Sequence, residues 1–490
     1  MKDDYQLPPS WRMATLKDIG EIVSGGTPST KDSANFDGAI PWVTPADLTG
    51  YTAKLISRGR RNISKQGLGQ SSARILPKGA VLFSSRAPIG YVAIAAGELA
   101  TNQGFKNLIL TPNVEPDYVY FYLRNAKRLA EAHASGTTFK EISGARFAQL
   151  PIPVPPLAEQ RRIVERIETL FARLEKGEEA VRQVQGLLRR YRQSVLKAAV
   201  TGELTADWRA ANRDRLEPGR KLLSRILKKR RETWTGRGRY NEPVAPDTSD
   251  LPELPEGWVW ASLAQITEIR GGVTVDKKRE TSDPVTLPYL RVANVQNGFL
   301  DLSEIKEIKV ERATAERSLL APGDILLNEG GDRDKLGRGW VWKGEIDRCI
   351  HQNHVFRARP VLAEMPSEFI SHYANAFGQP FFMTQGKQSV NLASISLTAI
   401  SRLPVPFPSI EEQREILSRL EACLGQADIA TELCQTELAR STALRQSILK
   451  QAFSGRLVPQ DPTDEPATAL LARIRADRNA GSVASRRKVL

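Results

Sequence analysis

The residues that could form a metal or catalytic centre are few in this sequence. Cys349, His351, His354 and His372 are close enough along the chain to suggest a metal site, because thiolates and imidazoles are the usual ligands of zinc. The chain of 490 residues has only four histidines, however, and the other half contains no second cluster of this kind. We therefore expect these side chains to be plain polar or base-facing residues, and we expect no metal.

Two further patterns imitate catalytic or nucleotide-binding motifs. Asp283 with Glu304 and Lys306 has the residue types of a nuclease site that holds a catalytic metal, but the segment SEIKEIK reads more simply as a surface strand. The glycine-rich segment 330–339 lacks the Lys-Ser/Thr step of a phosphate-binding loop, and no glycine fingerprint follows a strand. We therefore expect the chain to bind neither ATP nor a methyl donor by itself.

The overall charge favours a polyanionic partner. The chain has 70 lysine and arginine residues against 56 aspartate and glutamate residues, for a net charge of +14. A densely basic segment at 223–239 is better interpreted as a solvated helix, because its copy near Ile474 is more acidic. Three cysteines leave one unpaired, and neither a membrane span nor a signal peptide is evident, so we expect a cytoplasmic protein with reduced thiols.

The chain contains an internal duplication. Residues 150–171, LPIPVPPLAEQRRIVERIETLF, return as LPVPFPSIEEQREILSRLEACL at 403–424, an offset of 253 residues. The segment LPPSW at 7–11 returns as LPEGW at 254–258, so the duplication begins at the N-terminus. Repeats of this length are domains rather than the short units of a solenoid, and they predict an approximate twofold axis.

Each repeat carries a long helical segment, at 157–200 and 410–453. Apolar residues follow alternating steps of four and three over about five heptads, with only Gly177 leaving a position empty, which is typical of a coiled coil. We expect the two helices to pair antiparallel; the alternative is that each packs on its own globular half or on another protein. The copy has a poorer seam, with Glu437 and Ser441 at two apolar positions. The predicted first seam is Ile163, Ile167, Leu170, Leu174, Val181, Val184, Leu188, Tyr191, Val195 and Ala198.

The globular halves at 12–149 and 259–402 combine short strand-like segments with one helix each, which predicts α+β domains. The clearest expected strands are 80–85, 91–96 and 106–112, and the expected helices are 116–132 and 367–377. The halves diverge in the middle, where SSRAPIG at 84–90 faces NEGGDRDKLGRG at 328–339. Similar ends around dissimilar middles suggest one task performed on two different targets.

These motifs resemble the specificity subunit of type I restriction-modification systems. The resemblance rests on the PxPxxxxEQ signature before each long helix, on LPEGW and SSRAPIG, and on SGGTPS at 24–29 and IPWVTPADL at 40–48, and it covers essentially the whole chain. It implies two target recognition domains, each reading one part of a split, asymmetric sequence of double-stranded DNA. It also implies an antiparallel coiled coil that fixes the gap between the parts and docks two methyltransferase subunits.

The resemblance implies a chain without a catalytic centre. Restriction subunits would join the complex to give an ATP-dependent nuclease, so S-adenosylmethionine, ATP and Mg²⁺ are expected in the partner subunits and no cofactor in this chain. The expected organisation is a first target recognition domain at 1–150, a first long helix at 151–204, a basic helical linker at 205–250, a second target recognition domain at 251–403, a second long helix at 404–457 and a C-terminal helical tail at 458–490.

Side chains that can contact phosphates or base edges gather in the globular halves. The expected DNA contacts are Arg58, Arg60, Arg61, Lys65, Gln66, Arg86, Asn102 and Gln103 in the first half, and Lys277, Arg291, Asn294, Asn328, Arg333, Lys335, Gln352, Asn353 and Lys387 in the second. For each of them a solvated cation or a turn-forming amide is the alternative. Arg86 could instead brace the corner between a strand and a turn.

The segments that start the two helices are the expected docking surface, because both copies must present the same face to two identical partners. The expected contacts with the methyltransferase subunits are Glu159, Gln160, Arg161, Arg166, Glu412, Gln413, Arg414 and Arg419; the alternative is packing within the chain. Two other functions remain open. The chain could be a free-standing, sequence-specific DNA-binding regulator, or a stand-alone restriction endonuclease or methyltransferase, for which no motif is present.

Overall fold

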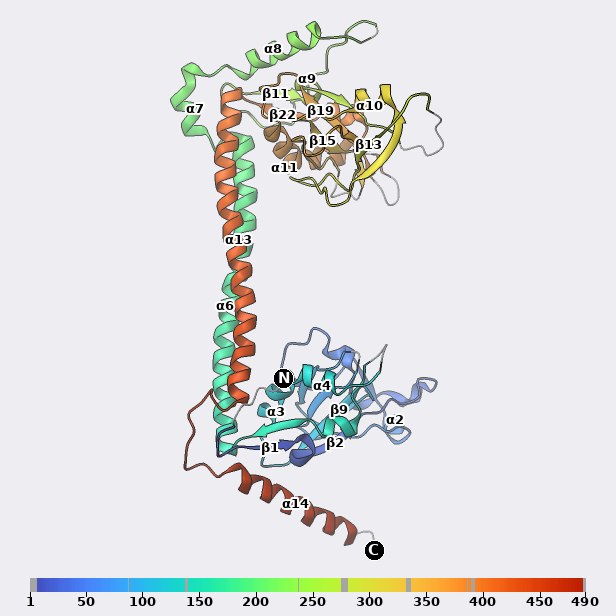
Figure 1. Cartoon of the computed structure of the whole chain (residues 1–490), viewed down its shortest axis with the longest axis vertical. Coiled ribbons are helices and arrows are strands. Elements are labelled where there is room, and N and C mark those ends of the chain that lie inside the picture. Colours follow the sequence, from blue (N-terminus) through green and yellow to red (C-terminus); the bar gives the residue numbers. More distant parts are fainter. Residues whose placement is uncertain are drawn as a thin grey trace. The chain divides into compact units, whose positions relative to one another are not determined.

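The structure, a computed structural model, describes residues 7–86, 88–136, 140–236, 238–274, 281–331, 336–385, 387–388 and 393–487. The chain divides into two compact units (Figure 1). The first comprises residues 1–182 with 435–490, and the second comprises 183–434. Within the described ranges, no helix is both long enough and apolar enough to cross a bilayer.

The globular domain of the first unit is built on a five-stranded sheet with the order β2-β9-β6-β7-β4 and a smaller sheet with the order β5-β3-β8. In the smaller sheet β3 pairs antiparallel with β5 and parallel with β8. The strands are β1 Arg12–Thr15, β2 Gly20–Ser24, β3 Phe36–Val43, β4 Leu55–Ile56, β5 Arg61–Ile63, β6 Val81–Ser84, β7 Val92–Ala95, β8 Ala100–Thr101, β9 Phe105–Leu110 and β10 Pro151–Val154; the helices are α1 Leu16–Ile19, α2 Lys65–Gly69, α3 Pro116–Asn125, α4 Lys127–Ala132 and α5 Gly144–Ala148.

The second globular domain repeats the strand order of the first in both sheets, but among the described residues its main sheet has no counterpart of β4 and a further sheet with the order β16-β21-β20 is present. Its main sheet has the order β12-β19-β15-β17, and its smaller sheet places β13 between antiparallel β14 and parallel β18. The strands are β11 Val259–Ser262, β12 Thr267–Arg270, β13 Pro284–Leu290, β14 Lys306–Glu311, β15 Ile325–Asn328, β16 Gly330–Gly331, β17 Gly339–Val341, β18 Ile350–His351, β19 Val355–Pro360, β20 Lys387–Gln388, β21 Ala393–Ser394 and β22 Pro404–Phe407; the helices are α9 Leu263–Ile266, α10 Arg312–Ser318, α11 Ser367–Gln385 and α12 Leu397–Ser401.

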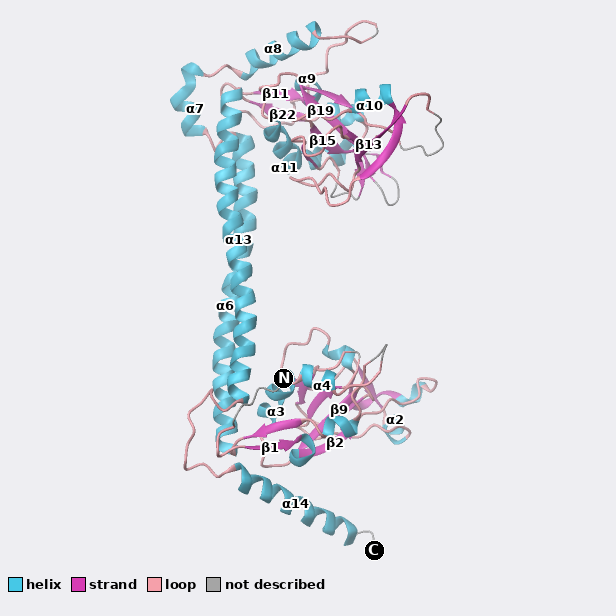
Figure 2. Ribbon diagram, viewed as in Figure 1, coloured by secondary structure: helices cyan, strands magenta, loops and turns pink. Residues whose placement is uncertain are grey.

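The duplication and the α+β class are therefore confirmed, and Figure 2 shows strands mixed with helices in each globular domain. The strands expected at 80–85, 91–96 and 106–112 are confirmed as β6, β7 and β9, and the expected helices correspond to α3 with α4 and to α11. Each domain also has short helices beyond the single one that was expected. Each domain is closed by a two-stranded ribbon, β1 with β10 and β11 with β22, that leads directly into a long helix.

The long helices α6 Leu157–Thr201 and α13 Ile410–Phe453 form an antiparallel coiled coil. In the first unit the Glu178 carboxylate accepts a hydrogen bond from Ser441 at 2.6 Å and pairs with Arg445 at 3.2 Å. In the second unit Arg192 pairs with Asp428 at 2.6 Å. The hydrogen bond from Ser441 and the charge of Arg445 lower the pKa of Glu178, so this part of the seam is polar.

The seam shifts along α6. Ile163 and Ile167 are fully buried as expected, but the prediction is wrong for Val184 and Tyr191, which are 43% and 42% exposed. Arg192 occupies the seam instead and donates a hydrogen bond to Thr431. A straight α-helix drifts by about 20° per heptad relative to a strict seven-residue repeat, so a heptad pattern read over five repeats accumulates this error.

Gly177 weakens α6 without serving its packing. A Cβ atom built there would meet nothing within 4 Å, and the residue is exposed. Because glycine loses more backbone entropy in a helix than alanine, we expect Gly177→Ala to raise the free energy of unfolding by about 1 kcal/mol. Urea denaturation of the first unit, followed by hydrogen exchange, measures this gain. A drop in stability would show that the position is crowded.

Matching segments follow both long helices. In the second unit, α7 Ala206–Asn212 and α8 Gly219–Glu232 follow α6, and Leu222 and Ile226 of α8 are buried in the core of that unit. In the first unit, α14 Ala467–Arg487 follows α13, and its Leu470 and Ile474 are buried in the same way. The basic segment in the linker and its copy near Ile474 are thus packing elements, each a surface helix with one buried face.

Candidate nucleic-acid interface

Three of the candidate DNA contacts of the first domain lie at one end of its main sheet. Arg86 follows β6, and Asn102 and Gln103 precede β9, where the Ser85 amide donates to the Gly104 carbonyl at 2.7 Å. Asn102 is half-buried, and its Oδ1 accepts a hydrogen bond from the Gly104 amide at 2.9 Å, so it shapes the turn. Gln103 is exposed and contacts Thr27 of the SGGTPS segment. The turn therefore exposes the Gln103 side chain to solvent, whereas the Asn102 side chain is held within the turn.

Arg86 has the bracing contact that its position suggested. Its guanidinium lies 3.5 Å from the Glu141 carboxylate, and the same carboxylate lies 3.5 Å from the Lys106 ammonium. Arg86 and Glu141 are also joined as an isolated β-bridge. Because 39% of the Arg86 side chain remains exposed, the residue can contact a phosphate only together with Glu141, which reduces its net charge.

The basic segment of the first domain is exposed. It comprises Arg58, Arg60 and Arg61 around β5, with Lys65 and Gln66 at the start of α2. The Arg60 side chain is 84% exposed, and its nearest carboxylate, Asp47, is 3.9 Å away. Arg61 lies over the Phe36 ring at 4.1 Å, and Gln66 donates to Asp32 at 2.9 Å. These exposed cations satisfy the basic requirement for phosphate contact.

Two candidate residues of the second domain have internal roles instead. Asn294 is 3% exposed and donates from Nδ2 to the carbonyls of Asp301 and Glu304 at 2.8 and 3.0 Å. Asn328 is fully buried and donates to the Val295 carbonyl at 2.8 Å. A buried amide that stabilises its own loop cannot reach a base edge, so the role of these two residues is to hold the conformation of the loops around them.

The remaining candidates of the second domain are Arg291, Gln352 and Asn353, which are half-buried at the end of the domain where β13, β18 and β19 meet. Arg291 donates to the Glu304 carbonyl oxygen at 2.8 Å and is the most constrained of them. Lys277, Arg333 and Lys335 lie outside the described residues, and of Lys387 only the backbone is described, in β20.

The possible catalytic clusters are not assembled. The Nδ1 atom of His351 bonds to the Val355 carbonyl at 2.6 Å, and the His372 ring packs edge-on against Trp340. Among the described residues, no group of three or more His, Cys, Asp or Glu side chains could hold a metal ion. Asp283 pairs with Arg312 beyond one end of the β13–β14 ladder, whereas Lys306 and Glu304 pair with each other at the opposite end, so the three residues share no site.

His351 contributes a pH dependence to the stability of the second unit. Burial lowers its pKa from the usual value to about 4. Because the unfolded chain binds the proton more readily than the folded one, we expect stability to fall as the pH drops from about 6.5 to 4, by up to about 3 kcal/mol. Acid titration of the unfolding free energy should show a flatter profile in His351→Gln. His133→Gln, at an exposed position, should keep the wild-type slope.

The Glu-Gln pairs that start the two long helices are buried. Glu159 and Gln160 are 1% and 0% exposed, and Glu412 and Gln413 are 2% and 0% exposed. In the first unit the Glu159 carboxylate accepts hydrogen bonds from the indole of Trp11 at 2.9 Å and from Gln460 at 2.5 Å. Direct contact of these four side chains with a partner does not fit this burial.

The second unit repeats the arrangement with a stronger donor. Glu412 accepts hydrogen bonds from the Trp258 indole at 2.9 Å, from the Thr205 hydroxyl at 2.9 Å and from the Arg209 guanidinium at 2.7 Å. The tryptophan of each LPxxW segment is thus fixed to the helix that follows its own domain. The spacing of 148 and 154 residues between these partners hides the contact from a reading of the sequence.

The candidate arginines near these pairs are more accessible. Arg161, Arg166 and Arg414 are exposed, and Arg419 is half-buried between Asp207 and Glu415. Arg161 lies 3.5 Å from the Glu115 carboxylate. The part of the predicted docking surface that a partner can touch therefore consists of these arginines.

Comparison with known proteins identifies the family to which this arrangement belongs. A family described as the type I restriction modification DNA specificity domain matches residues 8–181 and again 255–436. The chain belongs to this family. It is 32% identical to the MjaIX specificity subunit of Methanocaldococcus jannaschii over 69% of this chain and 70% of that protein. It is 25% identical to the EcoKI specificity subunit of Escherichia coli over 99% of each chain.

Solved structures support the fold of the specificity subunit. A chain from a type I restriction-modification system superposes with a TM-score of 0.64 at 19% identity, covering 92% of this chain and all of that one. The HsdS subunit of Thermoanaerobacter tengcongensis gives a TM-score of 0.54 at 18% identity, covering 93% and 99%. The chain is therefore a specificity subunit of the type I kind, a class that recognises DNA sequence and is itself non-catalytic.

Proposed function

We propose that each globular domain reads one half of a bipartite, asymmetric DNA target. The observation that carries this proposal is the shared strand order around unlike loops. In both domains the segments after β6 and β15 stand next to those before β9 and β19, yet they supply Arg86 and Gln103 in one case and Gln352 and Asn353 in the other. One scaffold with two sets of polar side chains suits two different base sequences.

The long helices set the spacing between the half-sites in this proposal. An α-helix rises about 1.5 Å per residue, so a coiled coil of this length is a rigid spacer. The two half-sites would lie about one helical turn apart, or about 34 Å, on the same face of the duplex.

Two methyltransferase subunits dock at the helix starts. The support for this number is the duplication of the Trp-Glu-Gln arrangement, which gives each unit the same local surface next to Arg161 or Arg414. Two equal surfaces accommodate two identical partners. S-adenosylmethionine, ATP and Mg²⁺ then belong to the partner subunits, including the restriction subunits of the full complex, and the assembly acts on DNA in the cytoplasm.

An exchange of one globular domain tests the proposal. The chain is expressed with its methyltransferase subunits, residues 259–402 are replaced by the equivalent segment of a relative with a known target, and methylated sites are sequenced. One half-site should change while the other half-site and the gap are kept. The matched exchange of residues 12–149 should change the other half-site. Changes in both halves after a single exchange would contradict separate reading.

A further inference from the structure

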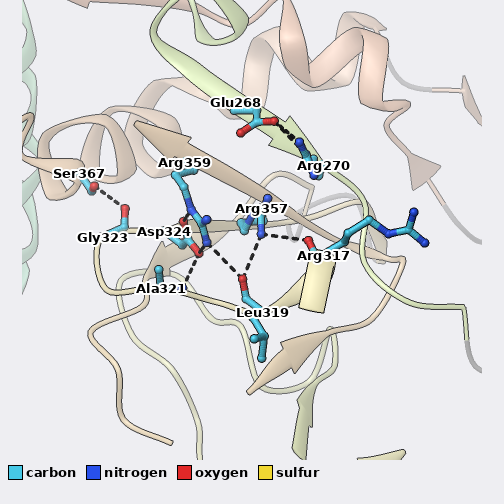
Figure 3. Close-up of polar contacts among 10 residues, drawn as sticks. All are labelled: Glu268, Arg270, Arg317, Leu319, Ala321, Gly323, Asp324, Arg357, Arg359 and Ser367. Carbon is cyan, nitrogen blue, oxygen red and sulfur yellow. Dashed lines mark hydrogen bonds and ion pairs between the residues drawn. The ribbon is translucent and has the colours of Figure 1, made fainter. Parts of the chain in front are cut away.

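The second domain contains a cavity of about 270 Å³ beside its edge strand β12. Four arginines line it: Arg270 at the end of β12, Arg317 in α10, and Arg357 and Arg359 on the neighbouring strand β19. Arg270 and Arg357 are register partners, and alternate residues of a strand face the same side of the sheet. Figure 3 shows these side chains with the polar groups around them.

Two of the four arginines are neutralised within the domain, and a third, Arg317, is exposed. Arg359 forms a two-pronged pair with Asp324, at 2.6 Å from Nε and 2.7 Å from Nη2. Arg270 pairs with Glu268 on its own strand. Glu316, which also lines the cavity, pairs with Arg348 at 2.5 Å. These carboxylates therefore have cations of their own.

Arg357 has no such partner. It is 3% exposed, and its Nη1 atom donates to the carbonyl oxygens of Leu319 at 3.0 Å and Arg317 at 3.5 Å (Figure 3). Its Nε atom is buried without a hydrogen-bond partner, and among the described residues no carboxylate lies within ion-pair distance of it. Burial and the neighbouring charge of Arg359 lower the pKa of Arg357, although the more distant carboxylates of Asp324 and Glu268 act in the opposite direction, and arginine remains charged at neutral pH.

A buried charge without a carboxylate in direct contact costs several kcal/mol, so a domain that keeps one has a reason to do so. The first domain has no such buried charge at the equivalent position. By strand register, the equivalent of Arg357 is Asn107, whose Nδ2 donates to the Thr101 hydroxyl at 2.7 Å and to the Val23 carbonyl at 3.1 Å. The scaffold can therefore fold with an uncharged residue here, and the charge belongs to the second domain alone.

We propose that this cavity binds a phosphate group, which Arg357 holds from below with Arg270 at the rim. A guanidinium fork matches the geometry of a tetrahedral oxyanion, and Nε with a neighbouring Nη forms the two-pronged contact. The phosphate is a backbone phosphate of the bound duplex, which rests on the proposed function, or a free phosphate ion. The chemistry at the cavity is the same for both sources, and the two parts of the test separate them.

The first part of the test titrates the full-length chain with inorganic phosphate and follows the thermal unfolding of the second unit. Phosphate should stabilise the wild type. Arg357→Asn, which introduces the residue of the first domain, should weaken phosphate binding about tenfold or more, and Arg270→Gln by about threefold. Arg312→Gln removes an exposed, ion-paired cation outside the cavity and is the matched control. Equal phosphate affinity in the wild type and Arg357→Asn would overturn the proposal.

The second part measures DNA affinity against salt for the complex with its methyltransferase subunits. If the phosphate is a backbone phosphate, Arg357→Asn should lower the slope of log K against log salt by about 1 and leave the preferred sequence unchanged. An unchanged slope with weakened phosphate binding assigns the cavity to the free ion. Loss of the proposed function would instead show as non-specific DNA binding by the wild type, a result independent of the phosphate titration.

Discussion

Replacing Glu412 with alanine should lower the free energy of unfolding of the second unit by about 4 kcal/mol. Removal of one partner of a buried ion pair has a large cost because it leaves the other charge buried and unpaired. The change leaves the Arg209 guanidinium, the Trp258 indole and the Thr205 hydroxyl without their shared acceptor, in a site where the carboxylate is 2% exposed. Guanidinium denaturation, with hydrogen exchange assigned to each unit, measures the loss. It should be confined to the second unit.

Two variants control this result. Glu411→Ala removes an exposed carboxylate one residue earlier and should change stability by less than about 0.5 kcal/mol. Glu159→Ala in the first unit should cost less than Glu412→Ala, about 2 kcal/mol, because its donors Trp11 and Gln460 are neutral. If the Glu411 and Glu412 variants proved equally stable, the buried carboxylate would not anchor the domain to the helix.

The repeat itself was the most informative feature of the sequence. An offset of 253 residues between two copies of one signature predicted the duplicated domains and the paired helices, because long-range identity survives where packing demands it. The identity of strand order in the diverged middles could not be predicted this way. It depends on register pairs such as Val43 with Thr101 and Leu290 with His351, which have no common residues.

The coiled-coil seam shows a second limit. The apolar pattern assigned Val184 and Tyr191 to the interface, yet both are exposed, since the helix follows its own 3.6-residue period and Arg192 fills the position with polar partners. Part of the interface between the two helices is formed by the polar residues Ser441 and Arg192. A search for apolar residues alone therefore cannot identify this interface.

The polar candidates were the least predictable. Asn294, Asn328 and the Glu-Gln pairs have the residue types of an interface, but their side chains stabilise loops and helix starts. Arg357 is the reverse case, because nothing in the segment FRARP distinguishes a buried guanidinium without a counterion from a solvated one. Burial of a polar group depends on which strands pack around it, and this information is spread over the whole domain.

Lengthening both long helices should move the two half-sites apart. We expect an insertion of seven residues after Arg182 in α6, matched by seven after Cys434 in α13, to lengthen the coil by about 10 Å, at about 1.5 Å per residue. Seven residues preserve the heptad phase, so each side chain keeps its face of the helix. With about 3.4 Å per base pair, the preferred gap should grow by about three base pairs.

Affinities for a series of targets that differ only in the gap measure this change. The original target should lose about a thousandfold in affinity, because only one half-site can be contacted at a time, and the target with the longer gap should regain it. Insertion into α6 alone is the matched control: the contacts of Glu178 with Ser441 and Arg445 and the contact of Arg192 with Asp428 can then no longer form in one register, so it should destabilise the coil without creating a new preferred gap. If the paired insertion kept the original gap, the helices would not act as the spacer, and the gap would have to be set by the partner subunits.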